Sequence, residues 1–269
     1  MTEPLQLQTE RMLATIDDNG IGWVTFNNPA RHNALSLEMW QGTGDIFEHF
    51  DANPAVRVAV MSGAGDKAFV SGADISEFDK TRASAAQRVE YGKIAGRGTL
   101  AMARFSKPLI AMIDGYCIGG GLATALAADV RFASPDSTFG IPAAKLGLGY
   151  EYEGLAKLCE LVGPAAARDI MLSARFFPSS EALAMGLINF TTPKADLLTE
   201  VAAYAERIAG NAPLTVAAAK AAVNTWERGG GATDIARVKS MVDACFDSAD
   251  YKEGRKAFAA KRKPRFKGA

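Results

Sequence analysis

The stretch Ile113-Asp-Gly-Tyr-Cys-Ile-Gly-Gly-Gly-Leu-Ala-Thr-Ala-Leu-Ala-Ala-Asp129 decides the fold of this chain. A short, continuously apolar run over 109–113 leads into it and predicts a buried strand. Gly119, Gly120 and Gly121 then open an alanine-rich helix that we expect to end near residue 128. A helix start lined with glycine offers free backbone N–H groups, which suit an anion or a developing oxyanion. The same glycines also suit close packing of helix on sheet, and this stretch alone does not choose between the two interpretations.

A dinucleotide-binding loop is a weaker alternative for these glycines. A G-x-G-x-x-G pattern that starts at Gly119 needs Gly or Ala at position 124, where the chain has Thr124. The phosphate-binding pattern G-x-x-x-x-G-K-[S/T] is also absent from the sequence. The glycines are therefore better explained by a backbone anion site or by packing.

Strand and helix patterns alternate on both sides of this stretch. Strands are predicted at 12–16, 21–26, 56–61, 129–133 and 187–192, and the first two flank Asp18-Asn19-Gly20 as a hairpin. Helices are predicted to begin after Ser36, Ser84 and Ser179, and the chain reads as helical from residue 197 onward. We therefore expect an α/β core over residues 1–195 and a helical region over residues 196–269.

A second strand-to-helix turn resembles the one at the glycine triplet. Lys67-Ala-Phe-Val-Ser-Gly-Ala-Asp74 is a loop of small residues that contains Gly72-Ala73, as the triplet contains Gly119-Gly120. Loops at the carboxyl ends of parallel strands form the ligand site in α/β folds. Two N–H groups from separate loops can converge there on one oxygen, as in an oxyanion hole.

The composition bounds the class of protein. The 269 residues are 48% hydrophobic, enough for one main core with an appendage. Lys plus Arg equals Asp plus Glu at 30 each, so we expect neither a nucleic acid nor a membrane surface as a partner. The three cysteines are far apart, which suits a cytoplasmic protein without disulfides. The two histidines lie outside any cluster, so no metal is expected.

Several longer stretches, in this order, resemble the crotonase superfamily, also called the enoyl-CoA hydratase/isomerase family. They include Asn27-Asn-Pro-Ala-Arg-His-Asn-Ala-Leu-Ser36, Gly63-Ala-Gly-Asp-Lys-Ala-Phe-Val-Ser-Gly-Ala-Asp-Ile75, Asp114-Gly-Tyr-Cys-Ile-Gly-Gly-Gly121, Ala128-Asp-Val-Arg-Phe-Ala-Ser134 and Phe139-Gly-Ile-Pro142. The resemblance covers nearly the whole chain. It implies a ββα spiral core, a C-terminal helical region, and homotrimers that often pair into hexamers. It also implies acyl-CoA thioesters as substrates, with no further cofactor.

The resemblance also assigns site residues. In the family, two backbone N–H groups hold the thioester oxygen, and these fall here on Ala73 and Gly120. Contacts to CoA are implied for a second set of residues: Lys67, Ala68, Asp74 and Gly119. Lys261 falls near a basic position that reaches the CoA phosphate, at times across a subunit boundary. A solvated, partly frayed end is the alternative for the basic tail over 261–267.

The chain departs from the family pattern at the proton-transfer groups. The hydratases of this family carry two glutamates at positions that fall here on Ala123 and Ala143. Water addition needs a base and an acid, each typically worth a factor of ~10²–10⁴, and a methyl group supplies neither. Hydration by the usual pair is therefore not expected.

The loop over 147–154 offers replacements. Tyr150 falls where the methylmalonyl-CoA decarboxylase branch has a tyrosine, and Glu151 falls where the dienoyl-CoA isomerase branch has a catalytic aspartate. Glu153 is a further carboxylate in the loop. A partly buried Glu151 beside an apolar acyl chain would have a raised pKa and transfer a proton at neutral pH. The alternative is that these acids only stabilise the start of a helix.

The sequence thus predicts an acyl-CoA enzyme that forms a thioester enolate between Ala73 and Gly120. Isomerase or decarboxylase chemistry with Glu151 or Tyr150 is favoured over hydration. Two alternatives remain, an enoyl-CoA hydratase that uses non-standard residues and a non-catalytic acyl-CoA binding protein. RNA binding, which some members of the family acquire, is disfavoured by the neutral charge.

Overall fold

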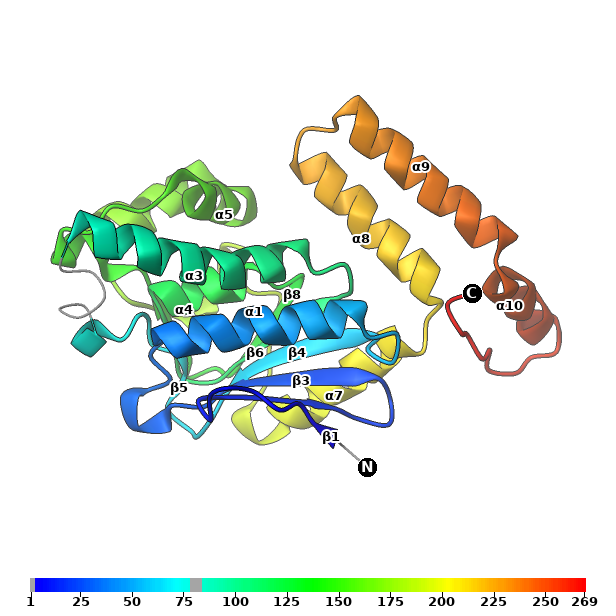
Figure 1. Cartoon of the computed structure of the whole chain (residues 1–269), viewed down its shortest axis with the longest axis horizontal. Coiled ribbons are helices and arrows are strands. Elements are labelled where there is room, and N and C mark those ends of the chain that lie inside the picture. Colours follow the sequence, from blue (N-terminus) through cyan, green and yellow to red (C-terminus); the bar gives the residue numbers. More distant parts are fainter. Residues whose placement is uncertain (1–2, 78–83) are drawn as a thin grey trace.

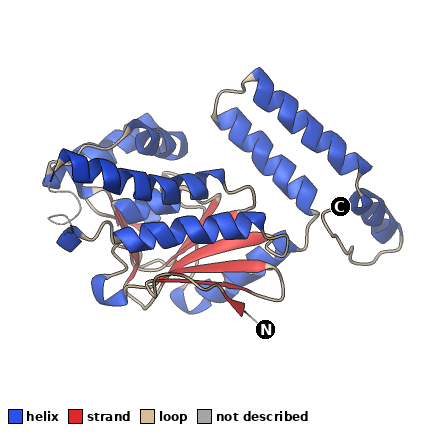
Figure 2. Cartoon of the chain, in the orientation of Figure 1, coloured by secondary structure: helices blue, strands red, loops and turns tan. Residues whose placement is uncertain are grey.

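The chain forms two β-sheets in a computed structural model that describes residues 3–77 and 84–269 (Figures 1 and 2). The large sheet has the strand order β1-β2-β3-β4-β6-β8-β11. Its strands span Glu3–Pro4, Met12–Ile16, Ile21–Phe26, Val58–Gly63, Leu109–Ile113, Val130–Ala133 and Phe190–Thr191. β1, β2 and β3 pair antiparallel, whereas β3, β4, β6, β8 and β11 pair parallel. The predicted hairpin of β2 and β3 is confirmed.

The small sheet has the order β10-β9-β7-β5, in which β9, β7 and β5 run parallel. Its strands span Phe177–Pro178, Thr138–Gly140, Tyr116–Ile118 and Ala68–Val70. None of them was predicted as a strand. A run of two or three residues is too short to show the alternation on which a strand prediction depends.

Three ββα units build the core, as the resemblance implied. They are β4-β5-α3, β6-β7-α4 and β8-β9-α5, with helices at Ala85–Arg104, Gly120–Leu126 and Tyr152–Ser173. In each unit the first strand joins the large sheet and the second joins the small sheet. The mixed α/β fold class is therefore confirmed. The ββα unit repeats in the path of the backbone but not in the amino-acid sequence.

Helices cover both faces of the large sheet (Figure 1). α1 (Leu37–Ala52) lies over one face, where its Phe47 belongs to the main apolar core together with Met61 of β4. α7 (Lys194–Ala209) covers the other face, and its Val201 packs with Val60 of β4 in a smaller core. Successive residues of β4 thus point to opposite cores, as the pleat of a strand requires.

Most predicted helix starts are confirmed, and one is wrong. The hydroxyl of Ser36 accepts the N–H of Met39, and that of Ser84 accepts the N–H of Gln87, so both serines cap their helices. The short helix α6 (Ser179–Ala184) has Pro178 at its N-cap instead. The Ser179 hydroxyl donates to the carbonyls of two residues in the preceding loop, Ser134 and Ser137. The strand predicted over 187–192 is also shorter than expected, because only β11 pairs.

The C-terminal helices lie to one side of the sheets (Figure 1). α8 (Pro213–Glu227) and α9 (Ala232–Asp247) run side by side, and α10 (Ala249–Ala259) follows. The link between α8 and α9 contains Gly229 and Gly230 at φ +85° and +69°, a conformation that favours glycine. None of the helices within residues 3–77 and 84–269 combines the length and apolar character needed to cross a membrane.

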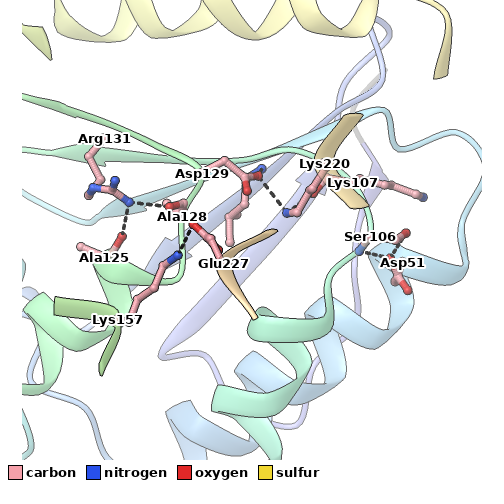
Figure 3. Close-up of polar contacts among 11 residues, drawn as sticks. Asp51, Ser106, Lys107, Ala125, Ala128, Asp129, Arg131, Lys157, Lys220 and Glu227 are labelled. Atoms are coloured by element: carbon pink, nitrogen blue, oxygen red, sulfur yellow. Dashed lines mark hydrogen bonds and ion pairs between the residues drawn. The ribbon is translucent and has the colours of Figure 1, made fainter. Parts of the chain in front are cut away.

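Ion pairs hold α8 against the core (Figure 3). The Nζ of Lys220 lies 2.8 Å from the Asp129 carboxylate and donates to the Lys107 carbonyl, also at 2.8 Å. Near the end of α8, the Glu227 carboxylate lies 2.8 Å from the Nζ of Lys157 on α5. Lys220 is only 11% exposed, so this pair is screened less by salt than a surface pair.

The tail after α10 makes specific contacts with that helix, which differs from the alternative of a frayed end. The buried carboxylate of Asp250 accepts the N–H groups of Lys267 and Gly268 at 2.7 Å each. The Ala269 carbonyl accepts the N–H groups of Ala249 and Asp250 at the start of α10. The Phe266 ring packs over Gly254, where a Cβ would lie 3.5 Å from it. The tail therefore closes back on its own helix.

Replacing Asp250 tests this closure. We expect Asp250→Ala to lower the free energy of unfolding by about 1–3 kcal/mol, because two N–H groups lose their acceptor. Trypsin should also cleave the tail sooner after Arg265 and Lys267. Urea unfolding and timed proteolysis measure both effects. Asp243→Ala, at an exposed position of α9, is the control and should change neither quantity; equal effects of the two variants would contradict the assignment.

Candidate functional site

The three second strands of the ββα units end side by side. Because β5, β7 and β9 are parallel neighbours, their carboxyl ends meet at one edge of the small sheet. Ala73 follows β5, Gly120 follows β7 and Ala143 follows β9. We call these three turns together the carboxyl edge. Gly120 lies between the other two turns because β7 is the middle strand.

The Ala73 turn is held by the segment that precedes α1. The Leu35 N–H donates to the Gly72 carbonyl at 2.7 Å, and the Asp74 N–H donates to the Leu35 carbonyl at 2.9 Å. These bonds fix both neighbours of Ala73 and leave its own N–H outside the pairing. Gly72 has φ +114°, which turns the chain out of β5 at this point.

Asn33 holds the segment before α1 against the start of β5 and was not predicted. Its side chain is fully buried, and its amide donates to the carbonyls of Ala64 and Ala68 at 2.9 and 2.7 Å. Its Oδ1 accepts the Asn28 N–H, and its backbone has φ 56°. An asparagine tolerates this left-handed conformation better than most residues. The motif over 27–36 contained the residue, but it carried no signal for the partner carbonyls 31 and 35 positions away.

The structure shows a packing role for one glycine of the triplet and leaves a second glycine partly open. A Cβ at Gly121 would lie 1.9 Å from the Val70 carbonyl oxygen, so this residue allows α4 to pack on β5. Gly119 has φ +55°, and its N–H donates to the Gly140 carbonyl of β9 at 2.8 Å. Gly120 faces open space apart from the Ala73 turn. Packing therefore explains Gly121, while Gly120 is left for a ligand.

The N–H groups of Ala73 and Gly120 are close together and unengaged. A Cβ built on Gly120 would lie 3.7 Å from the Ala73 nitrogen, so the two turns are adjacent. Neither N–H donates to an acceptor within the part of the chain that the structure describes. Both residues are partly exposed. Such a pair of open donors can bind one oxygen and stabilise negative charge on it.

Methyl groups stand at the two nearby positions where the hydratases of the family carry glutamates. Ala123 lies one turn into α4 after Gly120 and is half-buried. Ala143 is 5% exposed and belongs to the main apolar core. At these two positions the site therefore offers apolar surface and no acid or base.

Tyr150 is half-buried and packs against the main core. Burial raises the pKa of its phenol above the ordinary value. The hydroxyl is thus kept in its protonated form, in which it can donate a proton or a hydrogen bond.

Glu151 differs from the expectation of a partly buried acid. It is exposed and occupies the N-cap position of α5, with no side-chain capping bond among the described residues. The burial on which the argument for a raised pKa depended is therefore missing in the single chain. Glu151 instead lies at the start of a helix, as in the alternative interpretation of these acids. The side chain of Glu153 lies outside the described part.

The residues expected to contact CoA divide into two groups. Lys67 is exposed, and Ala68 is buried at the start of β5. The Asp74 carboxylate accepts the N–H and the hydroxyl of Ser76 at 3.0 and 2.6 Å, so it is engaged locally. Lys261 is exposed just after α10, on the far side of the molecule from β5 and α4 (Figure 1). One chain therefore does not bring Lys261 to the carboxyl edge.

The chain is similar to known proteins over most of its length. The profile of the family described as Enoyl-CoA hydratase/isomerase matches residues 17–269. A crotonyl-CoA hydratase of Syntrophomonas wolfei is 35% identical over 244 residues, covering 89% of this chain and 92% of the relative. An (E)-benzylidenesuccinyl-CoA hydratase of Thauera aromatica is 33% identical, covering 93% of this chain and 97% of the relative. A crystal structure of an enoyl-CoA hydratase/carnithine racemase from Magnetospirillum magneticum superimposes with a TM-score of 0.90, 36% identity and 97% coverage of both chains.

The chain belongs to the enoyl-CoA hydratase/isomerase family, the crotonase superfamily, as its sequence indicated. It is an acyl-CoA enzyme of this family.

A methyl group at position 120 tests the role of the paired donors. The new Cβ of Gly120→Ala would meet nothing closer than 3.7 Å, so the fold should persist. It would, however, stand next to the Ala73 N–H and obstruct the oxygen. We expect turnover of the best acyl-CoA substrate to fall by roughly 10²–10³-fold, the usual cost of losing one such donor. Gly96→Ala, where a Cβ meets nothing within 4 Å, is the control; full activity of Gly120→Ala would place the thioester oxygen elsewhere.

Proposed function

We propose that this enzyme forms a thioester enolate whose oxygen is held by the N–H groups of Ala73 and Gly120. Isomerisation or decarboxylation is favoured over hydration. The observation that carries the proposal is the carboxyl edge, where the two turns with open donors lie in line with the turn that carries Ala143, and Ala123 follows Gly120 by one helical turn. The donors stabilise an enolate, while the methyl groups neither activate water nor protonate carbon.

Of these reactions, decarboxylation needs the fewest proton-transfer groups in the site. In a malonyl-type thioester the bond from the α-carbon to the carboxylate breaks, and its electron pair becomes the enolate as CO₂ leaves. The enolate then needs one proton on the α-carbon. Isomerisation needs a proton to be removed and returned, so it also requires a base.

Tyr150 and Glu151 are the proposed proton-transfer groups. The half-buried phenol of Tyr150, with its raised pKa, supports a donor that serves decarboxylation. Glu151 is exposed in the single chain and would serve isomerisation only where a bound substrate or a second subunit covers it. The geometry of one chain thus favours Tyr150.

Two alternatives keep specific support. The relatives named above as hydratases favour hydration by residues other than the usual glutamates. The methyl groups at positions 123 and 143 favour a protein that binds acyl-CoA without converting it. Product analysis separates the three cases.

We also propose a homotrimer or a dimer of trimers, in the cytoplasm. Within the described chain α9 buries no residue, yet it exposes large apolar side chains, which are Ile235, Val242 and Phe246. A second copy that covers this face would remove apolar surface from water. In such an assembly Lys261 would serve the CoA of a neighbouring subunit, with Lys67, Ala68, Asp74 and Gly119 serving the CoA of their own. The three free cysteines suit a reducing compartment.

The reaction is tested by incubating the protein in D₂O with enoyl-, dienoyl- and malonyl-type thioesters and weighing the products. We expect loss of CO₂, or gain of deuterium without gain of water, because an enolate takes its proton from the site. A clean addition of water would establish the hydratase alternative. Binding without any product would establish the non-catalytic one.

The proton donor is tested by comparing Tyr150→Phe with Glu151→Gln. For a decarboxylated substrate we expect Tyr150→Phe to lower kcat by roughly 10²-fold or more and Glu151→Gln to leave it nearly unchanged. The wild-type rate should show no basic limb from Tyr150 below about pH 10, because its pKa is raised above that ordinary value. The reverse ranking of the two variants would assign the proton to Glu151.

A further inference from the structure

A cavity of about 230 Å³ lies at the opposite ends of the strands from the carboxyl edge. Val56 and Arg57 line it just before β4 begins, and Pro108 lines it just before β6. β4 and β6 run parallel, so both begin at the cavity. The carboxyl edge instead lies after β5 and β7, the strands that follow β4 and β6 along the chain. This cavity, which we call the amino-edge cavity, is therefore separate from the thioester site.

The core and the C-terminal region each form one wall of the amino-edge cavity. The second wall is the link from α7 to α8 with the first turn of α8, over 208–217, and Lys267 and Gly268 of the tail close it. Two contacts hold the walls together. The Arg57 guanidinium donates to the Phe266 carbonyl at 3.3 Å, and the Lys220 ammonium donates to the Lys107 carbonyl (Figure 3).

The charges that line the cavity all have one sign. Arg57, Lys107 and Lys267 line it, and no Asp or Glu does so. Arg57 and Lys267 form no ion pair within residues 3–77 and 84–269, while the Nζ of Lys107 donates to the carbonyls of Phe50 and Asn53 at 2.6 Å each. Burial also lowers the pKa of Lys107. The cavity therefore has a positive charge without a counter-ion from its own walls.

The acids nearest to these cations are engaged elsewhere. Asp51 attracts Lys107 electrostatically, but its carboxylate accepts the N–H and hydroxyl of Ser106. The Asp250 carboxylate accepts the backbone N–H groups of Lys267 and Gly268 from behind the tail. Neither carboxylate lines the cavity.

We propose that the amino-edge cavity binds a small amphipathic anion, a monocarboxylate with a short aliphatic chain. The planar guanidinium of Arg57 suits a carboxylate, which it can bind through two N–H groups. The remaining walls are largely apolar and suit the chain; they include Val56, Leu214, Val216 and Ala217. The volume corresponds to roughly eight water-sized groups at about 30 Å³ each, which admits a six-carbon acid and excludes a whole CoA thioester. Such a ligand would join the core, α8 and the tail, and would stabilise their attachment.

Hexanoate is the probe for this site, measured by calorimetry on the full chain with CoA at saturating concentration. Because free CoA leaves the acyl region open, the titration is repeated with a saturating S-hexyl-CoA thioether, and binding that remains then reports on the cavity. We expect saturable binding of hexanoate that weakens roughly tenfold or more in Arg57→Gln, because a charge-assisted hydrogen bond is lost. Lys239→Gln, an exposed lysine of α9 away from the cavity lining, should bind like the wild type.

A second variant separates loss of the site from loss of the fold. Ala217→Leu fills the cavity without changing a charge, and we expect it to abolish hexanoate binding while α8 and the melting temperature are kept. The neutral 1-hexanol and inorganic phosphate should each bind at least tenfold more weakly than hexanoate. Absence of saturable binding, binding that Arg57→Gln leaves unchanged, or phosphate binding as tight as that of hexanoate would overturn the proposal.

Discussion

The close approach of α4 to β5 is the constraint on which the rest of the structure depends. A side chain at Gly121 would collide with the Val70 carbonyl, so only glycine lets the helix start directly against the strand. This contact draws the end of β7 toward the end of β5 and puts the N–H groups of Ala73 and Gly120 side by side. The hydrogen bond from Gly119 to Gly140 fixes the third turn in the same line. A packing requirement of the backbone thus creates the donor pair.

The sequence predicted the parts of the fold that repeat over many residues. The hairpin of β2 and β3, the buried strand β6 and the start of α3 agree with their observed bounds. The small sheet was missed, because strands of three residues carry no periodicity. Ser179 was misread as a helix cap, since its hydroxyl has better partners in the loop at 134–137, distant in sequence. Tertiary contacts decided both cases.

The candidate site was predictable where its atoms belong to the backbone and less so where they belong to side chains. Glycines marked both turns that carry open N–H groups, and the family resemblance pointed to the same residues. The Asn33 side chain binds carbonyls at and before the start of β5, far along the chain, and no local sequence pattern predicted these contacts. Tyr150 is half-buried and Glu151 is exposed, although the two residues are adjacent in the chain. Burial depends on the assembled core and could not be predicted from their positions in the loop.

Both open donors are main-chain N–H groups, so their presence does not depend on the identity of a side chain. The acid and base groups of such a site, in contrast, are side chains. Any residue except proline keeps an N–H at position 73, so drift there leaves this donor in place. The side chains at positions 123, 143 and 150 can change without altering the path of β5 or β7. A scaffold of this kind can exchange its acids and bases one at a time over evolution. The reaction would then depend on a few replaceable side chains, while the backbone donors stay the same.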